Sequence, residues 1–479
     1  MKIKTVISVL LALAIMLFTS CATKPNEVLD ESAPEDEIEI FVPAEDSGKT
    51  DELGKRYFEY LENMSLAFSS NEPDTAENFE YEVYGDTIKI TEYIGQGSIV
   101  VVPDKIDGLS VTVIGENSFS NKNVRAVSIP DSVNKIEKSA FADSNGLSTL
   151  RIPFIGDGES ETNFGYVFGA SRYDENAVNV PSTLDMVIVG DRCKEIDDNA
   201  FVGCKMISAI SLPDTIEKIG KFAFYECFDL VCVKFGGANC EILDYAFGYC
   251  TSLYEIHLNG VRSIANGAFW RCSSLNGISL PFVGENEQEN QYIGHIFGAQ
   301  SADYNDEFVP ISLREITLTE GCDSIPDRAF ASCKYITKIN IPNSVKSIGV
   351  RSFYACRSLR ALVIPDSVIS VGDDAFFGCD NMTSIELGEG IEDIGMQAFY
   401  FCSALKSVKI PKKVSVIRPS TFYGCSSLEN VELVGVERIE KDAFGKCDSL
   451  IPPETSRVDY IAEGNDRLFE SHSDTTEGD

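Results

Sequence analysis

Histidine is scarce in this 479-residue sequence, and its scarcity narrows the chemistry that the chain could perform. The three histidines, His257, His295 and His472, are far apart and fall on different repeats, so they predict neither a catalytic triad nor a metal cluster. The sequence also lacks G-x-S-x-G, H-E-x-x-H, glycine-rich phosphate-loop and EF-hand patterns. We therefore expect no enzyme activity, no cofactor and no metal site.

Positive charge is scarce as well. The chain has 40 Lys and Arg against 75 Asp and Glu, which gives a net charge of −35. Such a chain repels nucleic acid and anionic membrane surfaces, so it argues against binding either by bulk electrostatics.

Long apolar runs are lacking except near the start of the chain. There, a short basic stretch precedes an apolar run from Val6 to Phe18, which is too short to span a bilayer and typical of a signal peptide. The next residues, FTSC, resemble the lipobox of bacterial lipoproteins, although Phe18 stands where that motif usually has leucine. The resemblance implies a signal peptide over 1–20 and a lipid anchor on Cys21, at the extracellular face of a bacterial membrane. An ordinary cleaved signal peptide is the alternative.

Residues 21–78 form an acidic region. Between 22 and 78 there are 16 Asp and Glu against 4 Lys and Arg, a net charge of −12. This composition, interrupted by prolines, cannot bury a core and predicts a disordered tether. One stretch within it predicts a short amphipathic helix, which we expect to lie in solvent without a partner; its apolar residues at helical spacing are Leu53, Tyr57, Leu61 and Met64.

A strict repeat organises residues 79–450. It is marked by a phenylalanine that recurs every 22 or 23 residues, apart from two gaps of 60 and 61 residues. Each gap holds one enlarged turn marked by an FGA sequence, at Phe168 and at Phe297. The repeat therefore predicts about fourteen turns, with the regular phenylalanines at 119, 141, 201, 224, 247, 269, 330, 353, 376, 399, 422 and 444.

One repeat, SLRALVIPDSVISVGDDAFFGC, illustrates how a turn is built. Alternating apolar residues end at Pro365, which stops a strand, and Val368 and Phe376 mark two further apolar edges. A single unit of this kind cannot bury its own apolar edges, whereas stacked copies form a continuous core. The pattern therefore predicts a mainly β solenoid with a parallel sheet along one face.

The pattern SLxxIxIPxSVxxIGxxAFxxC resembles the BspA-type leucine-rich repeats of bacterial surface proteins over residues 79–450. The resemblance implies a right-handed leucine-rich-repeat coil in a secreted or surface-anchored protein, which binds or adheres to a protein or glycan partner outside the cell. A passive structural spacer or scaffold on the cell surface is the alternative. Residues 451–479 leave the pattern and predict a short C-terminal cap followed by an acidic tail.

Ten of the 15 cysteines occupy one repeated position, three residues after the phenylalanine. A metal site would need clustered ligands, and the sequence has no C-x-x-C. Neighbouring copies about 4.8 Å apart are too distant for a disulfide, so we expect a column of buried, free thiols. Cys193 and Cys322 are expected to be structural too; the column comprises Cys204, Cys227, Cys250, Cys272, Cys333, Cys356, Cys379, Cys402, Cys425 and Cys447.

The position after the phenylalanine is often aromatic, and stacked copies would make a stripe of rings along one side. Packing between adjacent turns is one interpretation of this stripe. The other is a contact surface for a protein or glycan partner, since aromatic side chains anchor many interfaces. The candidate partner-binding residues are Tyr225, Trp270, Tyr354, Phe377, Tyr400 and Tyr423.

Two other surfaces are candidate binding sites. The outward position in the strand carries mixed side chains without a charge block, from Arg151 to Glu432, and indicates no particular ligand. The enlarged turns contain polar loops, FIGDGESETNFG and FVGENEQENQYIG, which must protrude because the core has no room for them. These loops are either binding sites or neutral insertions copied in a duplication.

Overall fold

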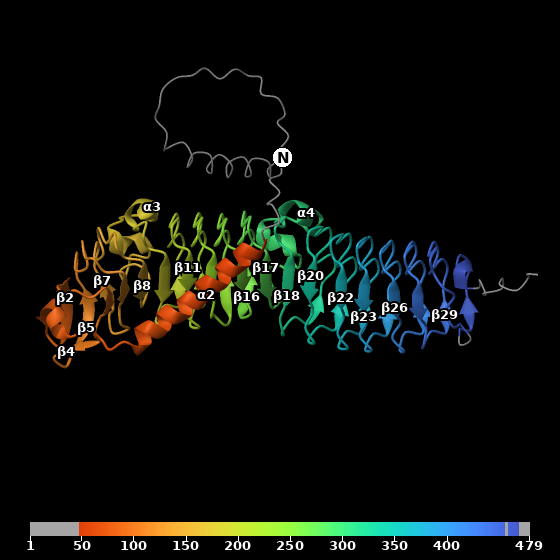
Figure 1. Cartoon of the computed structure of the whole chain (residues 1–479), viewed down its shortest axis with the longest axis horizontal. Coiled ribbons are helices and arrows are strands. Elements are labelled where there is room, and N and C mark those ends of the chain that lie inside the picture. The colour runs from red at the N-terminus through yellow and green to blue at the C-terminus, as the bar shows by residue number, and fades with distance from the viewer. Residues whose placement is uncertain (1–46, 456–457, 469–479) are drawn as a thin grey trace, which may run out of the picture. The chain divides into compact units, whose positions relative to one another are not determined.

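The computed structural model describes residues 47–455 and 458–468, most of which form a solenoid with two rows of strands (Figure 1). The first row is a ten-stranded parallel sheet followed by two parallel pairs, which confirms the predicted fold class. Its strands, in order, are β3 (Ile99–Val101), β6 (Ala126–Ser128), β8 (Thr149–Ile152), β9 (Met186–Val189), β11 (Ala209–Ser211), β13 (Cys232–Lys234), β15 (Glu255–His257), β17 (Gly277–Leu280), β18 (Glu315–Leu318), β20 (Lys338–Asn340), β22 (Ala361–Val363), β24 (Ser384–Glu386), β26 (Ser407–Lys409) and β28 (Asn430–Glu432).

The second row consists mostly of two-residue strands, with longer ones at its N-terminal end. They are β2 (Thr87–Tyr93), β5 (Leu109–Ile114), β7 (Lys135–Ile136), β10 (Glu195–Ile196), β12 (Lys218–Ile219), β14 (Cys240–Ile242), β16 (Val261–Ile264), β19 (Ser324–Ile325), β21 (Ser347–Ile348), β23 (Ser370–Val371), β25 (Asp393–Ile394), β27 (Val416–Ile417), β29 (Arg438–Ile439) and β30 (Tyr460–Ile461). β1 (Phe79–Tyr84) and β4 (Lys105–Ile106) pair antiparallel with β2 and β5 at the N-terminal end. The solenoid has about 16 turns rather than fourteen, since β2 and β30 add one turn at each end.

The marker phenylalanines form a column through the core. Phe353 and Phe376 stack with ring centroids 5.0 Å apart, and Phe399 and Phe422 stack at 5.2 Å. These four rings are fully buried. Consecutive regular turns thus place one aromatic ring on the next, which explains why the spacing of the repeat is so strict.

The repeated cysteines lie beside this column. The Sγ of Cys379 donates a hydrogen bond to the carbonyl oxygen of Phe353, one turn earlier, at 3.2 Å. Ser144 makes the equivalent bond from its Oγ to the carbonyl oxygen of Phe119 at 2.9 Å. All 14 cysteines in the described part of the chain are buried and free, which confirms the predicted thiol column.

Every regular turn bends at two residues in the left-handed conformation. They lie two positions before and two positions after the phenylalanine, as Gln397 (φ 56°) and Phe401 (φ 55°) do around Phe399. Glycine fills four of these positions, including Gly378 and Gly424, but most carry a side chain. This conformation disfavours bulky residues, so a bulky side chain at one of these positions indicates a role beyond forming the bend.

Helix α2 (Ser47–Ser70) lies obliquely across the first row of strands (Figure 1). Leu61 and Phe68 are buried against Met186, Ala209 and Cys232 of the sheet. The expectation of a solvated helix without a partner is therefore wrong, because apolar side chains on the strands provide a surface for it. No helix in the described part of the chain is long and apolar enough to cross a bilayer.

The remaining helices are short. They are η1 (Ala76–Asn78), η2 (Phe164–Phe168), η3 (Tyr173–Glu175), α3 (Asn176–Asn179), η4 (Ile293–Phe297), η5 (Ala302–Tyr304), α4 (Asn305–Phe308) and η6 (Asp466–Leu468). The two enlarged turns contain η2 to α3 and η4 to α4. The signal peptide, Cys21 and residues 21–46 of the predicted tether lie outside the described residues, as does the tail after 468.

Candidate binding surfaces

Four of the predicted aromatic residues meet in one continuous stack, which we call the aromatic ladder: Tyr354, Phe377, Tyr400 and Tyr423. Adjacent ring centroids are 5.0, 4.8 and 4.9 Å apart, and the ring planes are within 18° of parallel. All four side chains are partly buried. The ladder lies beside the phenylalanine column because each of its members directly follows a column residue.

The faces of the ladder rings are already occupied. Phe377 and Tyr400 each have a neighbouring ring on both faces. At the ends, the guanidinium of Arg351 lies 5.9 Å from the centroid of Tyr354, and the Lys446 ammonium lies 5.4 Å from that of Tyr423. A partner can therefore contact ring edges and tyrosine hydroxyls, but it cannot stack on these faces as a sugar ring usually does.

The other two predicted residues, Tyr225 and Trp270, lie two turns apart in the repeat. Tyr249 bridges them, with its ring centroid 5.5 Å from Tyr225 and 5.0 Å from Trp270. Tyr245 also packs against Trp270, at 5.7 Å. Tyr245 and Tyr249 occupy the two left-handed positions of their turn. Sequence reasoning missed them because it considered only the position directly after the phenylalanine.

Phe401 is an exposed aromatic residue beside the ladder that sequence reasoning also missed. It is 42% exposed although its backbone has φ 55°, a conformation in which a bulky residue is strained. Its ring packs edge-to-face on Tyr400, with centroids 4.6 Å apart. Gly424 makes room for the ring, because a Cβ at that position would lie 2.3 Å from Phe401 Cδ1.

A groove of about 460 Å³ runs along the ladder. Phe401 and two ladder rings form part of its wall, and Arg357 and Asp380 add a cation and a carboxylate whose charged atoms are 3.7 Å apart. This groove thus combines aromatic edges with groups that hydrogen-bond. Its other lining residues include Ser332, Ala355, Gly378 and Ser403.

The outward strand face is divided into two halves. Under α2, the first residues of β9, β11 and β13 are Met186, Ala209 and Cys232, all buried in one cluster. On most of the strands that follow, as at Glu255, Lys338 and Ser384, the same position carries an exposed polar side chain. The expected ligand face of the repeats is therefore occupied by the chain itself over its N-terminal half.

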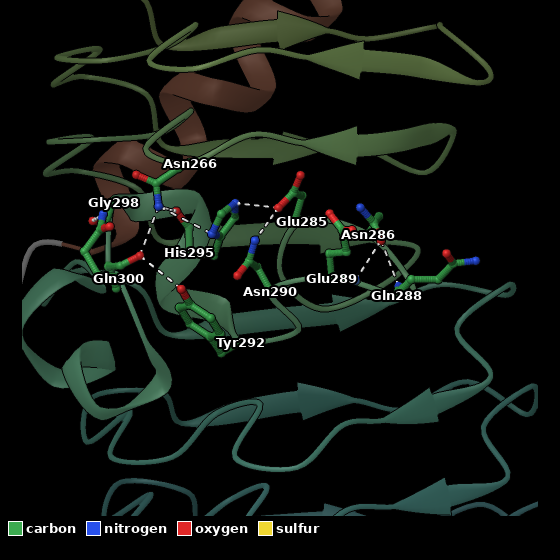
Figure 2. Close-up of polar contacts among 11 residues, drawn as sticks. Asn266, Glu285, Asn286, Gln288, Glu289, Asn290, Tyr292, His295, Gly298 and Gln300 are labelled. Carbon is green, nitrogen blue, oxygen red and sulfur yellow. Dashed lines mark hydrogen bonds and ion pairs between the residues drawn. The ribbon is translucent and has the colours of Figure 1, made fainter.

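The second enlarged turn holds a polar cluster around the buried side chain of His295 (Figure 2). Asn266 lies against the ring, with its Nδ2 3.4 Å from His295 Nδ1, and the carboxylate of Glu285 lies 3.4 Å from Nε2. Burial lowers the pKa of His295. The loop tip at 287–290 is exposed, as is 158–162 in the first enlarged turn, so both polar loops protrude as predicted.

None of the described residues forms a group of three or more His, Cys, Asp or Glu that could hold a metal ion. Burial also raises the pKa of the column thiols above the ordinary range, as for Cys402. A thiol with a raised pKa is a weak nucleophile and a weak metal ligand at neutral pH.

Comparisons with known proteins point to one family. The BspA type leucine rich repeat region matches in six copies, over residues 105–161, 176–292, 304–365 and 348–464. No curated protein matches the sequence.

Similar solved structures include a leucine-rich repeat protein from Bacteroides ovatus, at 21% identity over 76% of this chain and 100% of that chain, with a TM-score of 0.35. A leucine rich cell surface protein from Faecalibacterium prausnitzii is 22% identical over 83% and 97%, with a TM-score of 0.30. The pneumococcal vaccine antigen PcpA is 18% identical over 82% and 93%, with a TM-score of 0.29.

Proposed function

We propose a binding function for this chain, which belongs to the BspA type leucine-rich-repeat family. The chain is exported, held by a lipid on Cys21 at the cell surface, and uses its solenoid to bind or adhere to a protein or glycan partner. The apolar run and FTSC motif support the anchor, and the repeated aromatic surface supports the binding. The repeats act as a scaffold for contact rather than for catalysis.

The observation that carries this proposal is the strained, exposed ring of Phe401. Eleven other regular turns reach the same left-handed position with glycine or another residue, so the backbone does not require an aromatic side chain there. A residue that strains the backbone, adds no net stability and remains exposed is expected where it serves contact with another molecule. The ladder then supports that ring from below, through Tyr400 and Tyr423.

The groove beside Phe401 restricts how a partner binds. Since the ladder faces are covered, the partner meets the ring of Phe401 and the edges of Tyr354 and Phe377. It also meets the paired charges of Arg357 and Asp380. A groove of this kind fits a short extended peptide or one to two sugar units better than a flat protein surface.

The test is an array of glycans and extracellular matrix proteins, probed with the soluble chain beginning after Cys21. The Phe401→Ser variant should no longer bind the glycan or protein that the wild-type chain binds on the array. Ile369→Ser is the matched control, since Ile369 is also an exposed apolar residue (50%) but does not line this groove. Binding that survives Phe401→Ser would reject this surface, and a blank array would favour the passive spacer.

A further inference from the structure

Helix α2 packs on an apolar surface of the strands, which we call the seat of α2 and which is complementary to a helix. Tyr57, Leu61, Met64 and Phe68 follow an i, i+4, i+7, i+11 spacing that places them on one side of α2, and Leu61 and Phe68 are 0% and 6% exposed. The strand residues beneath form a separate apolar cluster from the solenoid core: Ala126, Met186, Ile188, Ala209 and Cys232.

Polar contacts at the edge of the seat fix the position of the helix. The hydroxyl of Tyr57 donates a hydrogen bond to Asp185 Oδ1 at 3.4 Å. Lys234 pairs with Glu62 at 3.5 Å, and its ammonium also lies 5.5 Å from the ring centroid of Phe58. These groups are exposed or half-buried, so they select a helix with acidic and aromatic residues at given positions without holding it strongly.

The connection between α2 and the solenoid is short and exposed. The last helical hydrogen bond runs from the amide of Asn71 to the carbonyl oxygen of Ala67, and residues 71–73 are exposed. Firm attachment resumes at Asp74, whose amide and carboxylate both bond to the backbone of Val101 at 2.8 and 2.9 Å. Because α2 contributes nothing to the main core cluster, it can leave its seat without opening the stacked turns.

We propose that α2 is a releasable strap, and that its seat is a groove for an acidic amphipathic helix of a partner protein. The partner helix carries the same anchor spacing as α2 and an acid that reaches Lys234, so α2 in its seat keeps the groove closed. This groove is separate from the surface around Phe401, so neither proposal depends on the other.

The reactivity of the Cys232 thiol reports whether α2 is in its seat, because this thiol is buried beneath α2. Cys402 serves as a reference because its thiol is buried inside the solenoid. The experiment compares maleimide labelling of both thiols in the full chain and in its Leu61→Glu, Phe68→Glu variant. We expect Cys232 to react at least 10-fold faster in the variant, with Cys402 unchanged. Unchanged Cys232 labelling, or equal acceleration at Cys402, would overturn the strap.

A second measurement tests the groove. A fluorescent peptide with the sequence of residues 51–70 should bind the double variant at least 10-fold more tightly than the wild-type chain, whose seat is filled. The same peptide with Leu61→Glu should bind neither. Failure to bind the variant, or equal binding to both chains, would overturn the groove. A wild-type chain that dimerises with its Cys232 protected would assign the seat to α2 of a second copy, which also overturns the partner helix.

Discussion

The Sγ of Cys402 donates a hydrogen bond to the carbonyl oxygen of Phe376 at 3.2 Å. That same carbonyl accepts a bond from the amide of Cys379, at 3.1 Å. Eight of the ten column thiols use the second acceptor site of a buried carbonyl in this way and tie one turn to the turn before it. The column is a hydrogen-bonding device as well as a filler of space, which accounts for the serine at position 144.

Replacement of Cys402 separates these two roles. Cys402→Ala removes both the bond and the buried sulfur and should destabilise the chain by about 1–2 kcal/mol. Cys402→Ser keeps a donor, so it should be about 0.5–1 kcal/mol more stable than the alanine variant. Urea unfolding midpoints of the two variants give the comparison. An alanine variant at least as stable as the serine variant would leave only the space-filling role.

Lipid anchoring is tested at the cysteine outside the repeat. Cys21→Ala should move the protein out of the membrane fraction, because no lipid can then be attached. Cys402→Ala is the matched control and should leave partitioning unchanged, since its thiol is buried. A Cys21→Ala protein that stays with the membrane would contradict the lipoprotein assignment.

The sequence predicted the repeat better than the surfaces that the repeat displays. Every regular phenylalanine lies in the core because its position is enforced by stacking on the rings of the turns beside it. The seat of α2 was missed although a signal existed: Met186 and Cys232 place apolar side chains at strand positions where later turns have Glu255 and Glu315.

The strained aromatics could not be recognised from the sequence in the same way. Phe401 reads there as one more apolar residue next to Tyr400. Its significance depends on φ, which is a property of the backbone of the stacked turn. The pairing of Tyr249 with Trp270 likewise depends on which side chains neighbouring turns bring together.

The pH dependence of stability should show the contribution of the buried His295 side chain. Its pKa is lowered by burial, with Glu285 opposing the shift, so the unfolded chain takes up the proton more readily than the folded chain. Stability from this residue is therefore full above the ordinary histidine pKa of about 6.5 and falls as the pH drops below it.

Tyrosine is the matched control, since Tyr166 holds the equivalent place in the first enlarged turn. Between pH 7.5 and pH 5, the unfolding midpoint of the wild-type chain should fall further than that of His295→Tyr. Carboxylates shared by the two proteins cancel in this comparison. Equal losses in the two proteins would show that His295 does not carry the effect.

Replacement of Phe401 by glycine should have little effect on stability. Relief of the left-handed backbone is worth about 1–2 kcal/mol, whereas the lost edge-to-face packing on Tyr400 and Tyr423 costs about 0.5–1.5 kcal/mol. The two effects nearly cancel, so the unfolding midpoint should stay close to that of the wild-type chain. Tyr400→Gly should instead cost about 3 kcal/mol or more, because this ring is stacked on both faces.

The substitution of Phe401 by glycine should weaken binding much more than it changes stability. If Phe401 contacts the partner, Phe401→Gly loses most of the affinity while its unfolding curve is unchanged, which is the signature of a residue retained for contact. A clear loss of stability in Phe401→Gly would mean that the packing of the ring by itself more than offsets the strain of its backbone. In that case the exposed ring would need no partner, and the aromatic surface would be part of the scaffold.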